Sequence, residues 1–127
     1  MSAAPRSRHV LDVVVTGATI AANGVAAYSD FTRGHFAVGM SAKVGVPLSV
    51  LPMSGTLKTA GAAGLALGLS GVPVVGTAAG TGLVLFFCGA VGVHLRAREH
   101  RYVLITSGYL ALAVGSLVLA AVRRPVR

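Results

Sequence analysis

The fold is decided by residues 47–95, PLSVLPMSGTLKTAGAAGLALGLSGVPVVGTAAGTGLVLFFCGAVGVHL. This stretch holds two apolar segments, about 47–69 and 72–95, and Ser70 and Gly71 separate them. Each segment is long enough for a helix that crosses hydrocarbon, which takes about 20 residues. So short a connection forces the two helices to be adjacent and antiparallel. We therefore expect a helical hairpin that spans a membrane.

Two further apolar segments, 10–28 and 102–122, flank this hairpin. The chain has 127 residues, of which 54% are hydrophobic and 11% charged, and this composition is far from that of soluble proteins. We predict a single domain that is all-α, an integral membrane antiparallel four-helix bundle. A cleaved signal peptide is the rival interpretation of the first segment, since Val25 and Ala27 suit a cleavage site, but polar residues interrupt the apolar run.

Residues 29–46 separate the first two predicted spans and contain Asp30, Arg33, His35 and Lys43. A segment of this length is unusual as a plain connector within a compact bundle. We predict that it is an interfacial segment or a lid.

The formal charge of +8 is compatible with nucleic-acid binding, but its distribution is not. Basic residues stand in short groups beside the apolar segments, where they contact lipid headgroups in membrane proteins. We therefore expect the lipid bilayer as a partner and no nucleic acid. Four spans place both termini on one side. Each side then carries five Lys or Arg, so the charge rule ties. We expect a multi-pass protein of the plasma membrane with cytoplasmic termini.

Lys58 is the one charged residue of the stretch 47–95 and lies about halfway along its segment. A lysine at the centre of a membrane helix costs about 2.5–3.5 kcal/mol, so it should face the protein interior with a partner. One interpretation is a structural ion pair. The other is a site that binds an anionic or carbonyl group or moves a proton.

The first segment carries a polar stripe, since Asp12, Thr16, Thr19 and Asn23 follow one another at steps of four, three and four residues. These positions share one helix face, which should point into the bundle rather than to lipid. Asp30 follows at the far end of that face.

Topology gathers several polar residues at one end of the bundle, because the first and third spans run parallel. Asp30, Arg33, His35, His94 and Arg96 could then surround the opening of a cavity that reaches Lys58. A histidine beside a carboxylate is a usable acid/base pair; the alternative is that His94 and Arg96 are interfacial anchors. The candidate catalytic residues are Lys58, Asp30 and His94, and the candidate substrate-binding residues are Asn23, Arg96, Arg33 and Ser54.

Glycines at four-residue spacing indicate close helix packing. Gly64 and Gly68 lie in one predicted span, and Gly76 and Gly80 in the next. Small residues at this spacing let helix backbones approach each other in lipid. The histidines lack a metal-ligand arrangement, and no phosphate-binding or dinucleotide motif is present, so we expect neither a metal nor a nucleotide.

Residues 55–99 resemble the DoxX-like small membrane proteins. The shared pattern is G-x-L-(E or K)-x-A-G-A-x-G-L-x-x-G-L, followed by a small-residue helix that ends A-V-x-x-H-L-R. The matching residues are Gly55, Leu57, Lys58, Ala60, Gly61, Ala62, Gly64, Leu65, Gly68 and Leu69, then Ala90, Val91, His94, Leu95 and Arg96. The resemblance implies four membrane helices and a link to membrane redox systems such as quinol or thiosulfate oxidation. Lys58 stands where many members carry an acidic residue.

Two functions remain open on these grounds. In the first, the bundle binds a lipophilic small molecule and acts as an acid/base enzyme (isomerase, cyclase or ring-opening) or a quinone-linked enzyme, a quinone being the one cofactor left open. In the second, the chain is a non-catalytic structural or assembly subunit of a membrane redox complex, or a homo-oligomer that associates through its glycine faces.

Overall fold

The computed structural model describes residues 3–123 and is all-α over that range, as predicted. Its helices are α1 (Ala3–Phe31), α2 (His35–Val44), α3 (Leu51–Leu69), α4 (Pro73–Arg96) and α5 (His100–Val122), with a 3₁₀ turn at Leu48–Val50 before α3. α1 begins earlier than the expected 10–28 and ends later. α2 occupies most of the segment 29–46, and Gly45, at φ 73°, ends it in the left-handed conformation that glycine adopts without strain.

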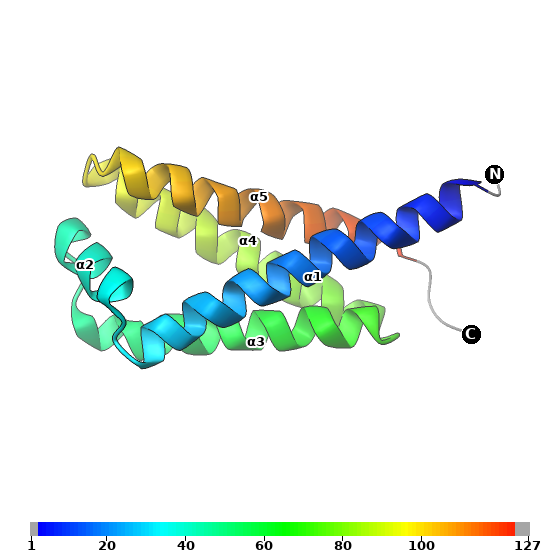
Figure 1. Ribbon diagram of the computed structural model, residues 1–127, viewed down its shortest axis with the longest axis horizontal. Coiled ribbons are helices and arrows are strands. Elements are labelled where there is room, and N and C mark those ends of the chain that lie inside the picture. The colour runs from blue at the N-terminus through cyan, green and yellow to red at the C-terminus, as the bar shows by residue number, and fades with distance from the viewer. Residues whose placement is uncertain (1–2, 124–127) are drawn as a thin grey trace.

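Four long helices lie side by side, and each runs antiparallel to the next one along the chain (Figure 1). α1 packs against α3 and α5, and α4 packs against α3 and α5, so the four form a closed ring. α2 lies at the end where α1 finishes and α3 begins, and the chain termini are at the opposite end (Figure 1). The end with α2 is called the cavity end below, and the other the terminal end.

Within residues 3–123, three helices are long and apolar enough to cross a membrane: Arg6–Phe31 within α1, α4 and α5. The expectation of four spans is therefore confirmed for three of them. α3 is comparable in length, at 19 residues, but Lys58 and several Gly and Thr residues lower its mean hydropathy.

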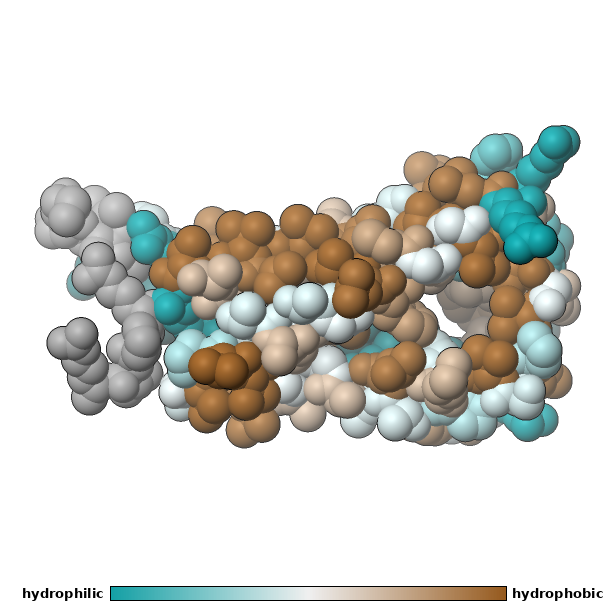
Figure 2. Space-filling model, turned by 180° about the vertical axis from the view of Figure 1, so that it is seen from behind, coloured by the Kyte–Doolittle hydropathy of each residue, from teal (hydrophilic) through white to brown (hydrophobic). Residues whose placement is uncertain are grey.

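The surface supports contact with lipid. Large apolar side chains such as Leu85 on α4 and Leu104 on α5 are 69% and 76% exposed. Figure 2 shows a broad apolar belt along the helices, with hydrophilic residues gathered towards the two ends. A soluble protein buries such residues, whereas a membrane protein presents them to lipid. The chain is therefore a multi-pass membrane protein in contact with the bilayer.

The predicted polar stripe of α1 is buried, as expected. Asp12 is 7% exposed, and Thr16, Thr19 and Asn23 are 0% exposed. Ser116 of α5 donates a hydrogen bond of 2.8 Å to the hydroxyl of Thr19, which joins the two helices. The stripe thus holds α1 inside the bundle.

The glycine interpretation is also confirmed as a statement about packing. An added Cβ at Gly64 would lie 2.5 Å from Cβ of Ala79, and one at Gly68 would lie 2.7 Å from Cα of Gly76. On the other side of α4, a Cβ at Gly80 would lie 3.0 Å from Cα of Leu117. α4 can therefore approach both α3 and α5 closely because these positions lack side chains.

The terminal end contains an ion pair that the sequence did not predict. Arg123 donates to both carboxylate oxygens of Asp12, with Nε–Oδ2 at 2.7 Å and Nη2–Oδ1 at 2.6 Å. Arg123 directly follows the apolar segment 102–122, where basic residues were expected to contact lipid headgroups. Instead it turns inward, because Asp12 is buried on α1 and requires a cation.

Candidate functional site

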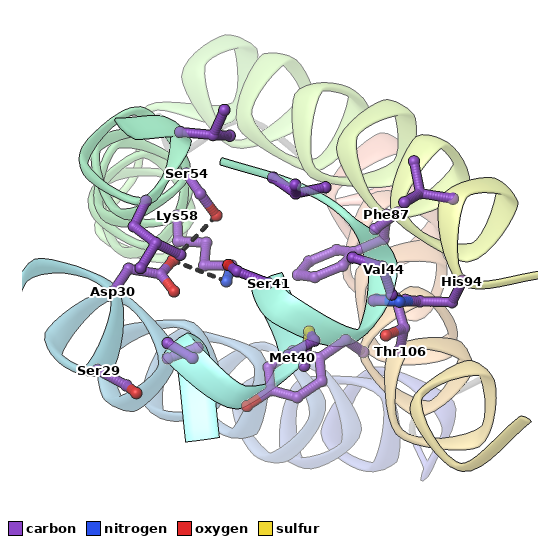
Figure 3. Close-up of a pocket in the computed structure, with 18 of the residues that line it drawn as sticks. Ser29, Asp30, Met40, Ser41, Val44, Ser54, Lys58, Phe87, His94 and Thr106 are labelled. Atoms are coloured by element: carbon purple, nitrogen blue, oxygen red, sulfur yellow. Dashed lines mark hydrogen bonds and ion pairs between the residues drawn. The ribbon is translucent and has the colours of Figure 1, made fainter. Parts of the chain in front are cut away.

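A cavity of about 560 Å³ lies at the cavity end, and residues from all five α-helices line it (Figure 3). Its wall is mostly apolar, with two separate groups of polar side chains. The lining residues include Asp30 of α1, Phe36, Met40, Ser41 and Val44 of α2, Ser54 and Lys58 of α3, Phe86, Phe87 and His94 of α4, and Ile105 and Thr106 of α5.

The first polar group is formed by Asp30, Ser54 and Lys58. Ser54 and Lys58 are four residues apart on α3 and so share one helix face, which α1 covers. Oδ2 of Asp30 accepts hydrogen bonds from Ser54 Oγ and from Lys58 Nζ, each at 2.9 Å (Figure 3). Lys58 Nζ also lies 5.6 Å from the ring centre of Phe86, within the range of a cation–π interaction.

This group is largely buried, since the side chains of Lys58 and Asp30 are 13% and 6% exposed. Two opposite charges in such a place must be paired, because each alone would lose its hydration without compensation. The prediction that Lys58 faces the interior with a partner is thus confirmed, and the partner is the carboxylate of Asp30.

The second polar group lies across the cavity from the first, on α4 and α5 (Figure 3). His94, in the last turn of α4, is 4% exposed, and Thr106 of α5 is 5% exposed. His94 Nδ1 is buried and has no hydrogen-bond partner among the described residues. The ring of Tyr102 lies 5.8 Å from that of His94, centre to centre, and covers it from the side of the α4–α5 connection.

Four of the seven candidate residues therefore surround one cavity: Asp30, Ser54, Lys58 and His94. The other three, Asn23, Arg33 and Arg96, are not among the residues that line it.

Asn23 is fully buried within the bundle, where its amide donates to the carbonyl of Thr19 at 2.9 Å. Arg33, in the connection after α1, and Arg96 are exposed. Arg96 follows His94 by two residues and therefore points to a different side of α4.

Sequence reasoning expected an interfacial segment or a lid at residues 29–46, but it did not identify the residues of α2 that line the cavity. Phe36, Met40 and Val44 line the cavity together with Ala37 and Ser41, so one face of this short helix closes the cavity. The signal was present in the sequence, because residues 36, 40 and 44 recur at a spacing of four and form one helix face.

No group of three or more His, Cys, Asp or Glu residues in the described part of the chain is placed to hold a metal ion. The polar groups of the cavity can instead donate and accept hydrogen bonds. Lys58 has three N–H donors, of which Asp30 takes one, and a histidine ring nitrogen can donate or accept. The cavity is suited to an apolar molecule with polar atoms at defined positions.

Comparison with known proteins agrees with this architecture. A search of curated proteins and a search of solved structures found no match. The model of the DoxX-like family matches residues 14–116, which include Asp30, Ser54, Lys58 and His94. Because the match covers most of the chain, from the polar stripe of α1 to Ser116 of α5, the protein belongs to the DoxX-like family.

Proposed function

We propose that this membrane protein binds a lipophilic small molecule in the cavity between its helices, with an oxygen atom of the ligand at Lys58. The observation that carries the proposal is a mostly apolar cavity of about 560 Å³ with a buried ion pair in its wall. Small-molecule sites are typically 300–1,000 Å³ in volume and combine apolar walls with a few polar groups that fix orientation.

The apolar wall sets the character of the ligand. Met40 and Val44 of α2, Phe87 of α4 and Ile105 of α5 offer only hydrocarbon, ring or thioether surface. A flexible methionine adapts to an irregular apolar shape. These side chains favour a hydrocarbon or ring skeleton taken up from the bilayer.

The Asp30–Lys58 pair determines which polar group of the ligand can bind beside it. The carboxylate already balances the ammonium charge, so an additional anion would leave the site with an uncompensated negative charge. A neutral carbonyl or hydroxyl oxygen accepts a hydrogen bond from Lys58 without that penalty. We therefore favour a neutral oxygen-bearing lipid or quinone over a fatty acid.

We further propose that α3 is a fourth membrane crossing. Its 19 residues extend about 28 Å, close to the thickness of the hydrocarbon layer. Lys58, which lowers its hydropathy, contacts Asp30 inside the protein and not lipid. With four crossings the two ends of the chain lie on the same side of the membrane, and we propose that this is the cytoplasmic side of the plasma membrane.

The same residues support acid/base chemistry. With a carbonyl oxygen at Lys58, the ammonium stabilises negative charge that develops on that oxygen. Asp30 uses Oδ2 for both of its hydrogen bonds, so Oδ1 is the oxygen that can take a proton from the neighbouring carbon. Isomerisation through an enolate is the reaction class that this geometry supports best.

The test is native mass spectrometry of the purified protein, with extraction and identification of co-purified small molecules. We expect a defined lipophilic molecule on the wild type and its loss from the Lys58→Met variant. Lys43→Met is the matched control, because Lys43 is an exposed lysine in the last turn of α2 and does not line the cavity. A wild type that carries no ligand, or a variant that keeps it, would contradict the proposal.

A second candidate function is that of a structural or assembly subunit. Two observations favour it: the Asp30–Lys58 pair is complete without a ligand, and Gly17, Gly24, Gly82 and Gly89 would have nothing within 4 Å of an added Cβ. Gly17, Gly24 and Gly82 do not line the cavity, so they leave low places on the outer surfaces of α1 and α4 where another membrane helix can approach. Purification in mild detergent with a stoichiometric partner protein, from both wild type and Lys58→Met, would support this function.

A further inference from the structure

We infer that the ligand of this cavity has two polar ends: a carbonyl-type oxygen at Lys58 and a hydroxyl at His94. The inference rests on the proposed ligand binding and specifies the chemical class of the molecule. It derives from the second polar group of the cavity, which the proposal above does not use.

His94 provides the first argument. Its side chain is 4% exposed and lines the cavity, yet Nδ1 has no hydrogen-bond partner among the described residues. Buried polar atoms in proteins are almost always paired, and an unpaired one calls for a specific explanation. Nδ1 itself is closed off by protein atoms, so a ligand in the adjacent cavity meets the ring, which Figure 3 shows directed into this space, at its other nitrogen, Nε2.

The distance between the two polar groups provides the second argument. Lys58 Nζ lies over the ring of Phe86, and His94 follows Phe86 by eight residues on the same helix, about 12 Å along its axis. Between them the cavity wall is formed by Phe87 of α4 and by Met40 and Val44 of α2 (Figure 3). A ligand that reaches both groups therefore has a rigid or extended apolar middle on the order of 10 Å long.

The chemistry of imidazole selects a hydroxyl. In a neutral histidine, each ring nitrogen, Nε2 included, is a donor in one tautomer and an acceptor in the other. A hydroxyl both donates and accepts, so it pairs with either form, whereas a carbonyl pairs with only one. Thr106 beside His94 adds a second hydroxyl that can complete the contact from α5 (Figure 3).

The experiment measures the binding of two matched probes to the protein in lipid nanodiscs, with empty nanodiscs to correct for partition into lipid. The probes are 4-acetyl-4′-hydroxybiphenyl, which carries both polar ends, and 4-acetylbiphenyl, which lacks the hydroxyl. We expect the wild type to bind the hydroxylated probe about tenfold more tightly, the value of one buried hydrogen bond. In His94→Phe, which keeps a ring of similar size, the two probes should bind equally.

Lys58→Met separates the two ends of the site. This variant should bind both probes more weakly and still prefer the hydroxylated one, because His94 is intact. If His94→Phe does not fold, Thr106→Val serves as the second variant. It should lower the preference for the hydroxylated probe several-fold. His100→Phe is the control, since His100 is exposed at the start of α5 and does not line the cavity.

Three outcomes would overturn the inference: equal affinity of the wild type for the two probes, an undiminished preference in His94→Phe, or no binding of either probe to the wild type. None of these outcomes concerns the co-purified ligand and its loss in Lys58→Met. If mass spectrometry finds a ligand that Lys58→Met loses, but the wild type binds the two probes equally, then the proposed function holds and the ligand has one polar end.

Discussion

Two buried ion pairs fasten α1 to the rest of the protein, and they differ in their surroundings. At the terminal end, Asp12 receives two hydrogen bonds from Arg123, at 2.6 and 2.7 Å, and a third from the hydroxyl of Thr16 at 2.9 Å. At the cavity end, Asp30 receives one hydrogen bond from Lys58 and one from Ser54, both at 2.9 Å. Each pair thus neutralises one of the two acidic residues of α1.

Packing distinguishes the two pairs. Arg123 reaches the crossing of α3 and α4, where an added Cβ at Gly68 would lie 3.0 Å from its Nη1 atom. Lys58 and Asp30 border a cavity of about 560 Å³ instead. The Asp12–Arg123 pair does not line this cavity, so it can hold helices together but cannot contact a ligand there, whereas the Asp30–Lys58 pair can do both. We therefore propose that the first pair serves stability and the second pair ligand recognition.

Arg123→Met is expected to have the largest effect, because it removes the cation and two hydrogen bonds from the buried carboxylate of Asp12 and leaves only the hydrogen bond of Thr16. Loss of one partner of a buried pair costs about 3–5 kcal/mol, and we expect a free energy of unfolding about 3 kcal/mol lower. Thermal or denaturant unfolding in one detergent measures it. Arg8→Met, at an exposed position of α1, is the control. A stable Arg123→Met variant would show that Asp12 is hydrated in the membrane.

Lys58→Met should lower the free energy of unfolding by about 2 kcal/mol, because Asp30 loses one hydrogen bond where Asp12 would lose two, and because Asp30 borders the cavity. The double variant Asp30→Asn/Lys58→Met should recover most of this loss and still bind no ligand. By contrast, Asp12→Asn/Arg123→Met should recover stability and keep the ligand. Equal ligand loss in both double variants would remove the distinction between the pairs.

Gly68→Ala tests the tight packing of the terminal end. The added methyl group would lie 2.7 Å from Cα of Gly76, a backbone atom that cannot move without shifting α4. We expect a loss of about 1–2 kcal/mol, typical of overpacking. Gly82→Ala is the matched control on α4, where nothing lies within 4 Å of the new Cβ. Equal stability of the two variants would show that the helices separate freely at this crossing.

The two ion pairs also show how far the sequence determines the site. The buried stripe of α1 and the need of Lys58 for a partner were predictable, because helical spacing and the cost of a charge in lipid act locally. The pairing of Arg123 with Asp12 was not, since the two residues are 111 positions apart and an arginine at a helix end is equally typical of a headgroup anchor. The exclusion of Arg33 and Arg96 from the cavity likewise depends on side-chain directions that topology alone does not give.

Ser54→Ala has the smallest expected effect and tests the finest difference between the two ion pairs. Ser54 is 9% exposed and its hydroxyl shares Oδ2 of Asp30 with Lys58, so its removal deletes one hydrogen bond but keeps the ion pair. We expect a free energy of unfolding about 1 kcal/mol lower. Ligand affinity should fall several-fold, because Asp30 can then rotate and carry Lys58 away from its place beside Phe86. Thr56→Val is the control, since Thr56 is exposed and bonds only to the carbonyl of Pro52 in its own helix. Unchanged ligand binding in Ser54→Ala would mean that the ion pair positions Lys58 without help, and the site would then reduce to the two charged residues.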